Sequence, residues 1–288
     1  MTGVRLNPTN DLVFKLLLVS DQALLVDMIE AVLDPPSPIE SLEVLDPEIP
    51  GDLTGDKAIR LDVRARFRDG SLVDVEMQAQ GRPAFPSRLL FYWGRNYTDT
   101  LARGQEYSAL RPAVSVVWCT STVVPTGRFH NTFLALEKSC GYPLSDHFQI
   151  HVLQLPHLSE ALDVSLRLQR WARFLGASTD QEFDTLAKED PIMAQAVQDL
   201  DKLSLDPQAR RRAQAREDDL RMYRNSLVES RLEGEAKGRA ETVLKVLTYR
   251  FGPVSESLAA KVRAASVDVL DEYTLRAVTA KSLDEVLE

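Results

Sequence analysis

Three oxygen-bearing side chains fall at positions that a β-hairpin would bring together. They are Asp62, Glu76 and Gln78, within the stretch RLDVRARFRDGSLVDVEMQ. Both halves of this stretch alternate apolar and polar residues, and RDG between them is a turn signal. Two carboxylates and an amide oxygen are hard ligands of the kind that Mg²⁺ prefers. A divalent ion there would offset the like charges, polarise a phosphoryl oxygen and lower the pKa of a water molecule.

The alternation also predicts the register of this hairpin. A three-residue turn at 68–70 places one apolar face along the pairs Leu61 with Met77, Val63 with Val75, and Ala65 with Val73. The other face then pairs Asp62 with Glu76 and Arg64 with Asp74. A two-residue turn would mix polar with apolar residues, because a one-residue slip reverses every side chain. The plain alternative to a metal site is a solvated strand face whose charges serve solubility.

The flanking segments predict helices and strands that would position this hairpin. A helix begins after Thr9 or Asn10, and a second helix spans about 21–33 before the prolines of DPPSP end it. An aromatic-rich helix follows the hairpin from about residue 85. Three apolar stretches predict further strands, namely PAVSVVWCTS, NTFLALEKS and HFQIHVLQL.

The character of the chain changes at about residue 158, after which every periodic segment predicts a helix. A long charged helix is expected at about 207–250, with two short helices after the sequence FGP. The sequence therefore predicts a mixed α/β (α+β) core domain at 1–157. A helical region is expected at 158–288.

Composition narrows the classes of function. The net charge of −9 argues against a broadly basic nucleic-acid coat protein, although residues 57–103 carry nine Lys or Arg against five Asp or Glu. No apolar run is long enough for a membrane span, and the first residues lack a signal-peptide pattern. Cys119 and Cys140 are the only cysteines and lack metal-ligand spacing. These features favour a cytosolic protein.

Other candidate chemistries are weaker. The four histidines have no Cys or acid at zinc-ligand spacing, so we interpret them as structural. The sequence contains neither a Gly-rich phosphate loop nor a G-x-S-x-G nucleophile motif. Four arginines form a basic cluster on the long helix: Arg210, Arg211, Arg212 and Arg216. A solvated helix is the default interpretation, with DNA contact or self-association as the second.

Three segments, taken in their order and spacing, resemble the PD-(D/E)XK nuclease superfamily. They are PTNDLVFKLLL, RLDVRARFRDGSLVDVEMQ and RLLFYWGRNYTDTL. More narrowly, the chain resembles the recombination-promoting nucleases, a group whose members are also described as transposases. The resemblance is densest over residues 8–101 and implies a restriction-endonuclease-like core, with a mixed central sheet flanked by helices. It implies a metal-dependent DNA endonuclease linked to recombination, mobile elements or defence.

The resemblance also implies roles for individual residues. Asp62 and Glu76 would hold Mg²⁺ or Mn²⁺, and Gln78 takes the position where the superfamily motif has Lys. Asp11 matches an acid on the first helix and completes the catalytic set, either as a further metal ligand or as a group that orients the attacking water. Its alternative role is that of a first-turn acid favoured by the helix dipole. Gln carries no charge that could stabilise an anionic transition state, which keeps a second hypothesis open. That hypothesis is a catalytically degenerate module that binds DNA or protein.

Three further residues are candidates for contacts with double-stranded DNA. Arg88 and Tyr92 lie four residues apart on the aromatic helix, and Lys15 lies four residues after Asp11. Arg suits bidentate contact with phosphate. Helix packing for Arg88 and Tyr92, and an ion pair between Lys15 and Asp11, are the simpler interpretations. Cutting both strands needs two active sites, so a homodimer is expected.

Overall fold

The computed structural model describes residues 5–46, 48–49, 59–60, 62–78, 84–160 and 164–287. Contacts divide the chain into two compact units, Met1–Arg216 and Glu217–Glu288. The division differs from the boundary that we expected at residue 157. Helices after that residue share the hydrophobic core of the sheet, and sequence periodicity alone does not tell which element an apolar helix face packs against.

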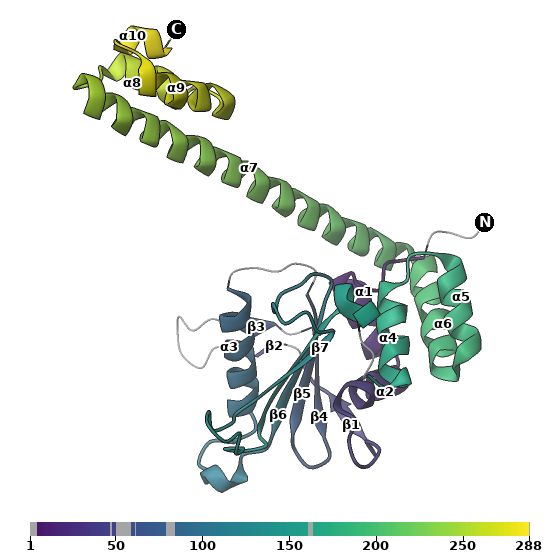
Figure 1. Cartoon of the computed structure of the whole chain (residues 1–288). Coiled ribbons are helices and arrows are strands. Elements are labelled where there is room, and N and C mark those ends of the chain that lie inside the picture. The colour runs from purple at the N-terminus through teal and green to yellow at the C-terminus, as the bar shows by residue number, and fades with distance from the viewer. Residues whose placement is uncertain are drawn as a thin grey trace. The chain divides into compact units, whose positions relative to one another are not determined.

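The first unit is built on a six-stranded mixed sheet (Figure 1). In spatial order its strands are β1 (Leu42–Val44), β4 (Val63–Phe67), β5 (Leu72–Gln78), β6 (Ala113–Cys119), β8 (Phe148–Gln154) and β7 (His130–Leu134). Strands β5, β6 and β8 are parallel, and the outer pairings are antiparallel. β6 is buried on both faces, which explains its nearly continuous apolar sequence.

The predicted register of the hairpin is confirmed. β4 and β5 pair Val63 with Val75, Arg64 with Asp74, and Ala65 with Val73. The predicted pair of Leu61 with Met77 lies outside the described residues. Strands β1 and β2 (Glu48–Ile49), in a segment expected to be a connection, were not predicted, and β2 pairs with β3 (Ile59–Arg60) in a separate two-stranded sheet. These strands are two or three residues long, too short for a period of two to be read from the sequence.

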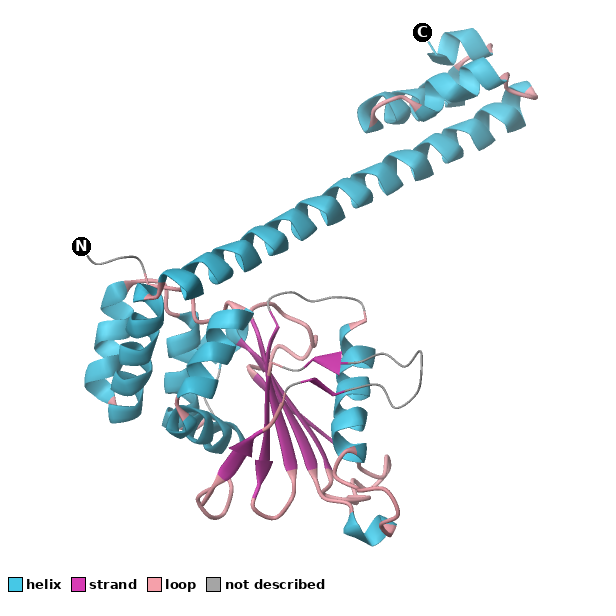
Figure 2. Ribbon diagram, turned by 180° about the vertical axis from the view of Figure 1, so that it is seen from behind, coloured by secondary structure: helices cyan, strands magenta, loops and turns pink. Residues whose placement is uncertain are grey.

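Helices cover both faces of the six-stranded sheet (Figure 2). On one face, α1 (Asp11–Ser20) and α2 (Gln22–Leu33) form the core together with α4 (Leu166–Gly176), α5 (Asp180–Glu189) and α6 (Pro191–Leu205). On the other face, α3 (Phe85–Thr98) packs through Phe85 and Leu89. Side chains of β5 alternate between these faces, so Val73, Val75 and Met77 enter the α1 core. The remaining face of β5, with Asp74, Glu76 and Gln78, is directed towards α3.

Local sequence signals set the ends of the helices beside the sheet. Asn10 caps α1, because its side chain accepts hydrogen bonds from the backbone N–H groups of Leu12 and Val13. Asp21 caps α2 in the same way, through the N–H of Ala23. Two short 3₁₀ turns, η1 (Tyr107–Ala109) and η2 (Leu155–Glu160), connect the later elements. The start of α1 is thus fixed one residue before Asp11.

The second unit is helical and has its own small core. Helix α7 (Pro207–Phe251) is the predicted long charged helix, and its last turns contribute Ala240, Val243 and Leu247 to that core. Three short helices follow, where we expected two: α8 (Glu256–Arg263), α9 (Val267–Thr279) and α10 (Leu283–Leu287). In the described part of the chain, every helix is too short or too polar to cross a membrane.

A histidine pair in β7 and β8, of which His151 is buried and His130 half-buried, predicts sensitivity to acid. His130 Nε2 and His151 Nδ1 lie 2.9 Å apart. Burial, and then the neighbouring His130, lower the pKa of His151 to about 4, and burial lowers the pKa of His130. A folded-state pKa below the usual 6.5 means that stability present above pH 6.5 is lost as the pH falls towards 4.

We expect His151→Phe, which keeps a ring at this position, to abolish most of this acid-dependent loss. The loss should amount to roughly 2–3 kcal/mol in the wild type between pH 7 and pH 4.5. Urea unfolding of both proteins at the two pH values measures it. An equal loss in the variant and the wild type would contradict the prediction.

Candidate active site

The hairpin places Asp62 beside the end of β5. Asp62 directly precedes β4, and its Oδ2 accepts a hydrogen bond of 2.9 Å from the backbone N–H of Met77. Burial is the main cause that raises the pKa of Asp62 to about 6, while the hydrogen bond from Met77 opposes it. The side chain is therefore held at the backbone of β5, where it acts electrostatically on Glu76.

Glu76 is a buried acid in an electrostatically unfavourable position. Burial raises the pKa of its carboxyl group well above the usual value, and the neighbouring Asp74 and Asp62 raise it further. The Arg88 guanidinium acts in the opposite direction. Within the described residues, no hydrogen-bond donor contacts the Glu76 carboxylate. Like charges are held together here, which is costly unless a cation joins them.

Helix α3 brings a guanidinium to the end of the same strand. Arg88 donates a hydrogen bond to the side-chain oxygen of Gln78. Its guanidinium carbon also lies 5.7 Å from the centre of the Tyr92 ring, one turn further along α3. Gln78, at the position where the superfamily motif has Lys, thus has the positive charge of Arg88 beside it.

Helix α1 adds two charged residues. Asp11 and Lys15 both act electrostatically on Asp62, Asp11 raising its pKa and Lys15 lowering it. Both oxygens of Asp11 are engaged, since Oδ1 accepts the N–H of Leu12 at 2.9 Å and Oδ2 accepts Nε of Arg216 at 2.7 Å. The structure therefore groups all seven predicted site residues: Asp11, Lys15, Asp62, Glu76, Gln78, Arg88 and Tyr92. Their individual roles stay predictions.

Arg216 was not predicted as part of this group. It lies on α7, and the sequence shows it only as one of four arginines on a charged helix. Arg216 lowers the pKa of Asp62, which places its charge within electrostatic reach of the candidate metal ligand. No local signal connects residues 205 positions apart, so only the folded chain reveals the pairing.

A buried polar cluster beside Glu76 was also missed, apart from the pairing of Arg64 with Asp74. Asp74 Oδ1 accepts hydrogen bonds from Ser115 Oγ at 2.8 Å and from Asn96 Nδ2 at 3.2 Å. Asn96 Oδ1 in turn accepts Nε of Arg64 at 2.7 Å. Burial raises the pKa of Asp74 to about 7. Asn96 is on α3, so the cluster connects that helix to β4, β5 and β6.

The donor set fits one divalent cation. Among the described residues, no three His, Cys, Asp or Glu side chains form a metal-binding group. Mg²⁺, however, commonly takes one or two carboxylates and several waters. Asp62 and Glu76 supply two carboxylates whose repulsion such an ion would relieve. These two residues could therefore hold Mg²⁺ or Mn²⁺.

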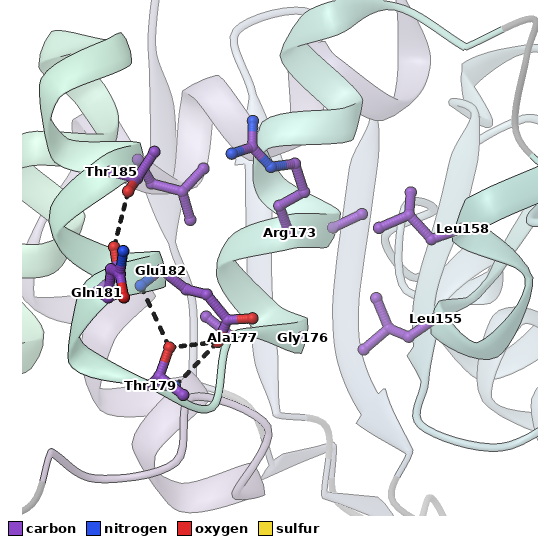
Figure 3. Close-up of a pocket in the computed structure, with 11 residues that line it drawn as sticks. Leu155, Leu158, Arg173, Gly176, Ala177, Thr179, Gln181, Glu182 and Thr185 are labelled. Atoms are coloured by element: carbon purple, nitrogen blue, oxygen red, sulfur yellow. Dashed lines mark hydrogen bonds between the residues drawn. The ribbon is translucent and has the colours of Figure 1, made fainter.

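A cavity of about 650 Å³ lies elsewhere, between η2, α4 and α5 (Figure 3). Leu155 and Leu158 form one side of it, and Thr179, Gln181 and Glu182 form the other. Glu182 and Thr179 form the capping box that starts α5. Glu182 and Thr179 of this wall thus serve the helix end, and none of the residues that line the cavity belongs to the group around Asp62 and Glu76.

Comparison with known proteins identifies one relationship. The family model described as PD-(D/E)XK nuclease family transposase matches residues 8–230. The match includes the hairpin, α1 and α3, and extends into α7. No curated protein and no solved structure gives a significant match.

Proposed function

The chain belongs to the PD-(D/E)XK nuclease transposase family, and on this premise we propose that it is a metal-dependent endonuclease that cuts double-stranded DNA. The observation that carries this proposal is the pair of acids at the end of the hairpin, the buried Glu76 and the partly buried Asp62, with cationic side chains around them. Lys15 and Arg88 act on the two acids from α1 and α3. This arrangement suits a phosphodiester, whose negative charge needs cations.

In the proposed reaction, water attacks the scissile phosphorus and the 3′ or 5′ oxygen leaves. Asp62 and Glu76 would hold Mg²⁺ or Mn²⁺, which when bound supplies positive charge to the phosphate oxygens and lowers the pKa of water. Arg88 would contact a phosphate oxygen and stabilise charge on it, with Gln78 orienting the guanidinium through their hydrogen bond. Tyr92 would keep the Arg88 side chain over its ring. Lys15 would contact a neighbouring phosphate.

The family suggests a role in recombination, mobile-element activity or defence. Because one site cuts one strand, a homodimer would account for double-strand cleavage. The second candidate function is a catalytically degenerate DNA-binding or protein-interaction module. The observation that favours it is Gln78, a neutral side chain where the superfamily motif has Lys.

A nicking assay on supercoiled plasmid distinguishes the endonuclease from the degenerate module. We expect the wild type to convert the plasmid to open circles with Mg²⁺ or Mn²⁺ but not with EDTA. Asp62→Ala should show no conversion, because it removes one of the two carboxylates. DNA binding without nicking, under either ion, would instead support the degenerate module.

A further inference from the structure

The first turns of α7 are fastened to the start of α1. Asn10, the residue that caps α1, donates a hydrogen bond of 3.1 Å from Nδ2 to the backbone oxygen of Ala213. Asn10 and Ala213 are both buried. Arg216 lies three residues after Ala213, on the same side of α7. It therefore meets Asp11, the residue that follows Asn10.

The pairing of Arg216 with Asp11 is oriented. Nε of Arg216 donates to Asp11 Oδ2 at 2.7 Å, and Nη2 contacts the same oxygen at 2.5 Å. The other oxygen of Asp11 accepts the N–H of Leu12. Asp11 therefore holds a guanidinium by one oxygen and its own helix end by the other. This geometry suits a role for Asp11 in orienting Arg216, and it suits a role as a direct metal ligand less well.

Arg216 remains accessible to a large ligand. Its side chain keeps 47% of its surface exposed, against 20% for Asp11. Together with Lys15 it acts on Asp62 from the side of α1, whereas Arg88 acts on Glu76 from the side of α3. Cations thus approach the pair of acids from both sides. A nucleic-acid strand presents successive phosphates that could meet both.

We propose that Arg216 binds a phosphate of the DNA strand beside the cleaved bond, and that Asp11 is the positioning residue that holds its guanidinium there. The inference rests on the proposed function in taking DNA as the substrate. It assigns the first turns of α7 to the DNA-binding surface, and it assigns Asp11 to Arg216 instead of to the metal ion.

Duplex binding in EDTA tests this proposal without any need for catalysis. Fluorescence anisotropy over a range of KCl concentrations gives the slope of log affinity against log salt. Arg216→Gln should lower affinity roughly tenfold near 0.1 M salt and reduce the slope by about 0.9, the value for one phosphate contact on B-DNA. Arg216→Lys keeps the charge and should keep most of the slope.

Arg211→Gln is the matched control, because it removes the same charge from the same helix. Arg211 is five residues from Arg216, about 140° around α7, and bonds to the carbonyl of Pro207 on its own helix. We expect it to leave the slope within error of the wild type. Equal effects of Arg211→Gln and Arg216→Gln would overturn the proposal, as would tighter binding by Arg216→Gln.

Asp11→Asn tests the positioning role. It should weaken binding several-fold in the wild type but add nothing in the Arg216→Gln background, because its effect passes through Arg216. A further loss in that background would overturn the assignment. A wild type that binds duplex but does not nick plasmid defeats only the proposed catalysis. If the wild type nicks plasmid but Arg216→Gln binds duplex as tightly as the wild type, only this inference is defeated.

Discussion

Replacing Glu76 by Gln is expected to abolish DNA cleavage while making the protein more stable. The Glu76 carboxylate is buried, and Asp74 and Asp62 both act to raise its pKa. Gln has nearly the same shape but no charge, so it removes this repulsion. We expect a gain of about 1–2 kcal/mol in the free energy of unfolding, as is typical where a functional site is kept at the expense of stability.

The same removal of negative charge that stabilises the fold is expected to cause the loss of cleavage. A neutral amide cannot provide the negative charge that would hold a divalent ion, and such an ion is worth several kcal/mol of transition-state stabilisation. The nicking rate should therefore fall at least about a hundredfold. Plasmid nicking measures the rate, and urea unfolding in EDTA measures stability.

Glu43→Gln provides the matched control on the same sheet. Glu43 is in β1, its side chain is largely exposed, and its carboxylate lies 3.9 Å from Nη1 of Arg66. We expect Glu43→Gln to change neither the nicking rate nor the free energy of unfolding. If Glu76→Gln kept normal nicking, the assignment of the site would fail. If it lowered stability, the carboxylate would have a partner in the folded protein that the amide cannot replace.

Part of this site could be predicted from the sequence, for a physical reason. Strand side chains alternate with a period of two, so the residues of one hairpin determine which partners face each other. Asp62, Glu76 and Gln78 could therefore be grouped from the alternation of residue types alone. The pairing of Val63 with Val75 confirms that register. Local periodicity likewise predicted α1, α2 and α3.

The missed features all depend on contacts between distant segments. Arg216 meets Asp11 only because α7 docks on α1, and nothing in either helix specifies that docking. Asn96 lies between aromatic residues on α3 and carries no signal of its own. The core shared by α4, α5, α6 and the sheet was missed for the same reason. Which of these distant segments pack together depends on the whole fold, and the chain offers many other apolar and polar faces that could have been partners.

Replacing Arg64 by Leu is expected to cause the largest loss of stability among substitutions beside the site. Arg64 is a buried residue of β4 that bonds to Asn96 through Nε and forms an ion pair with Asp99. It also acts electrostatically to stabilise the buried Asp74 carboxylate. Removing one partner leaves an uncompensated charge in the interior, at a cost of about 3 kcal/mol or more.

Asp74→Asn should have a much smaller effect, although it changes the same cluster. Asn keeps a side-chain oxygen that can accept from Ser115 and Asn96, and it places an N–H where Oδ2 of Asp74 is buried without a partner among the described residues. Arg64 still has Asp99. We therefore expect a change of less than about 1 kcal/mol, or a gain.

Urea unfolding of the two variants, beside Arg66→Leu, tests this contrast. Arg66 is on the same strand, but 42% of its side chain is exposed, so its removal should cost no more than about 0.5 kcal/mol. Because Asn96 and Arg88 share α3, we also expect Arg64→Leu to loosen the contact between Arg88 and Gln78. An Asp74→Asn variant as unstable as Arg64→Leu would mean that the negative charge of Asp74 itself stabilises the interface between α3 and the sheet.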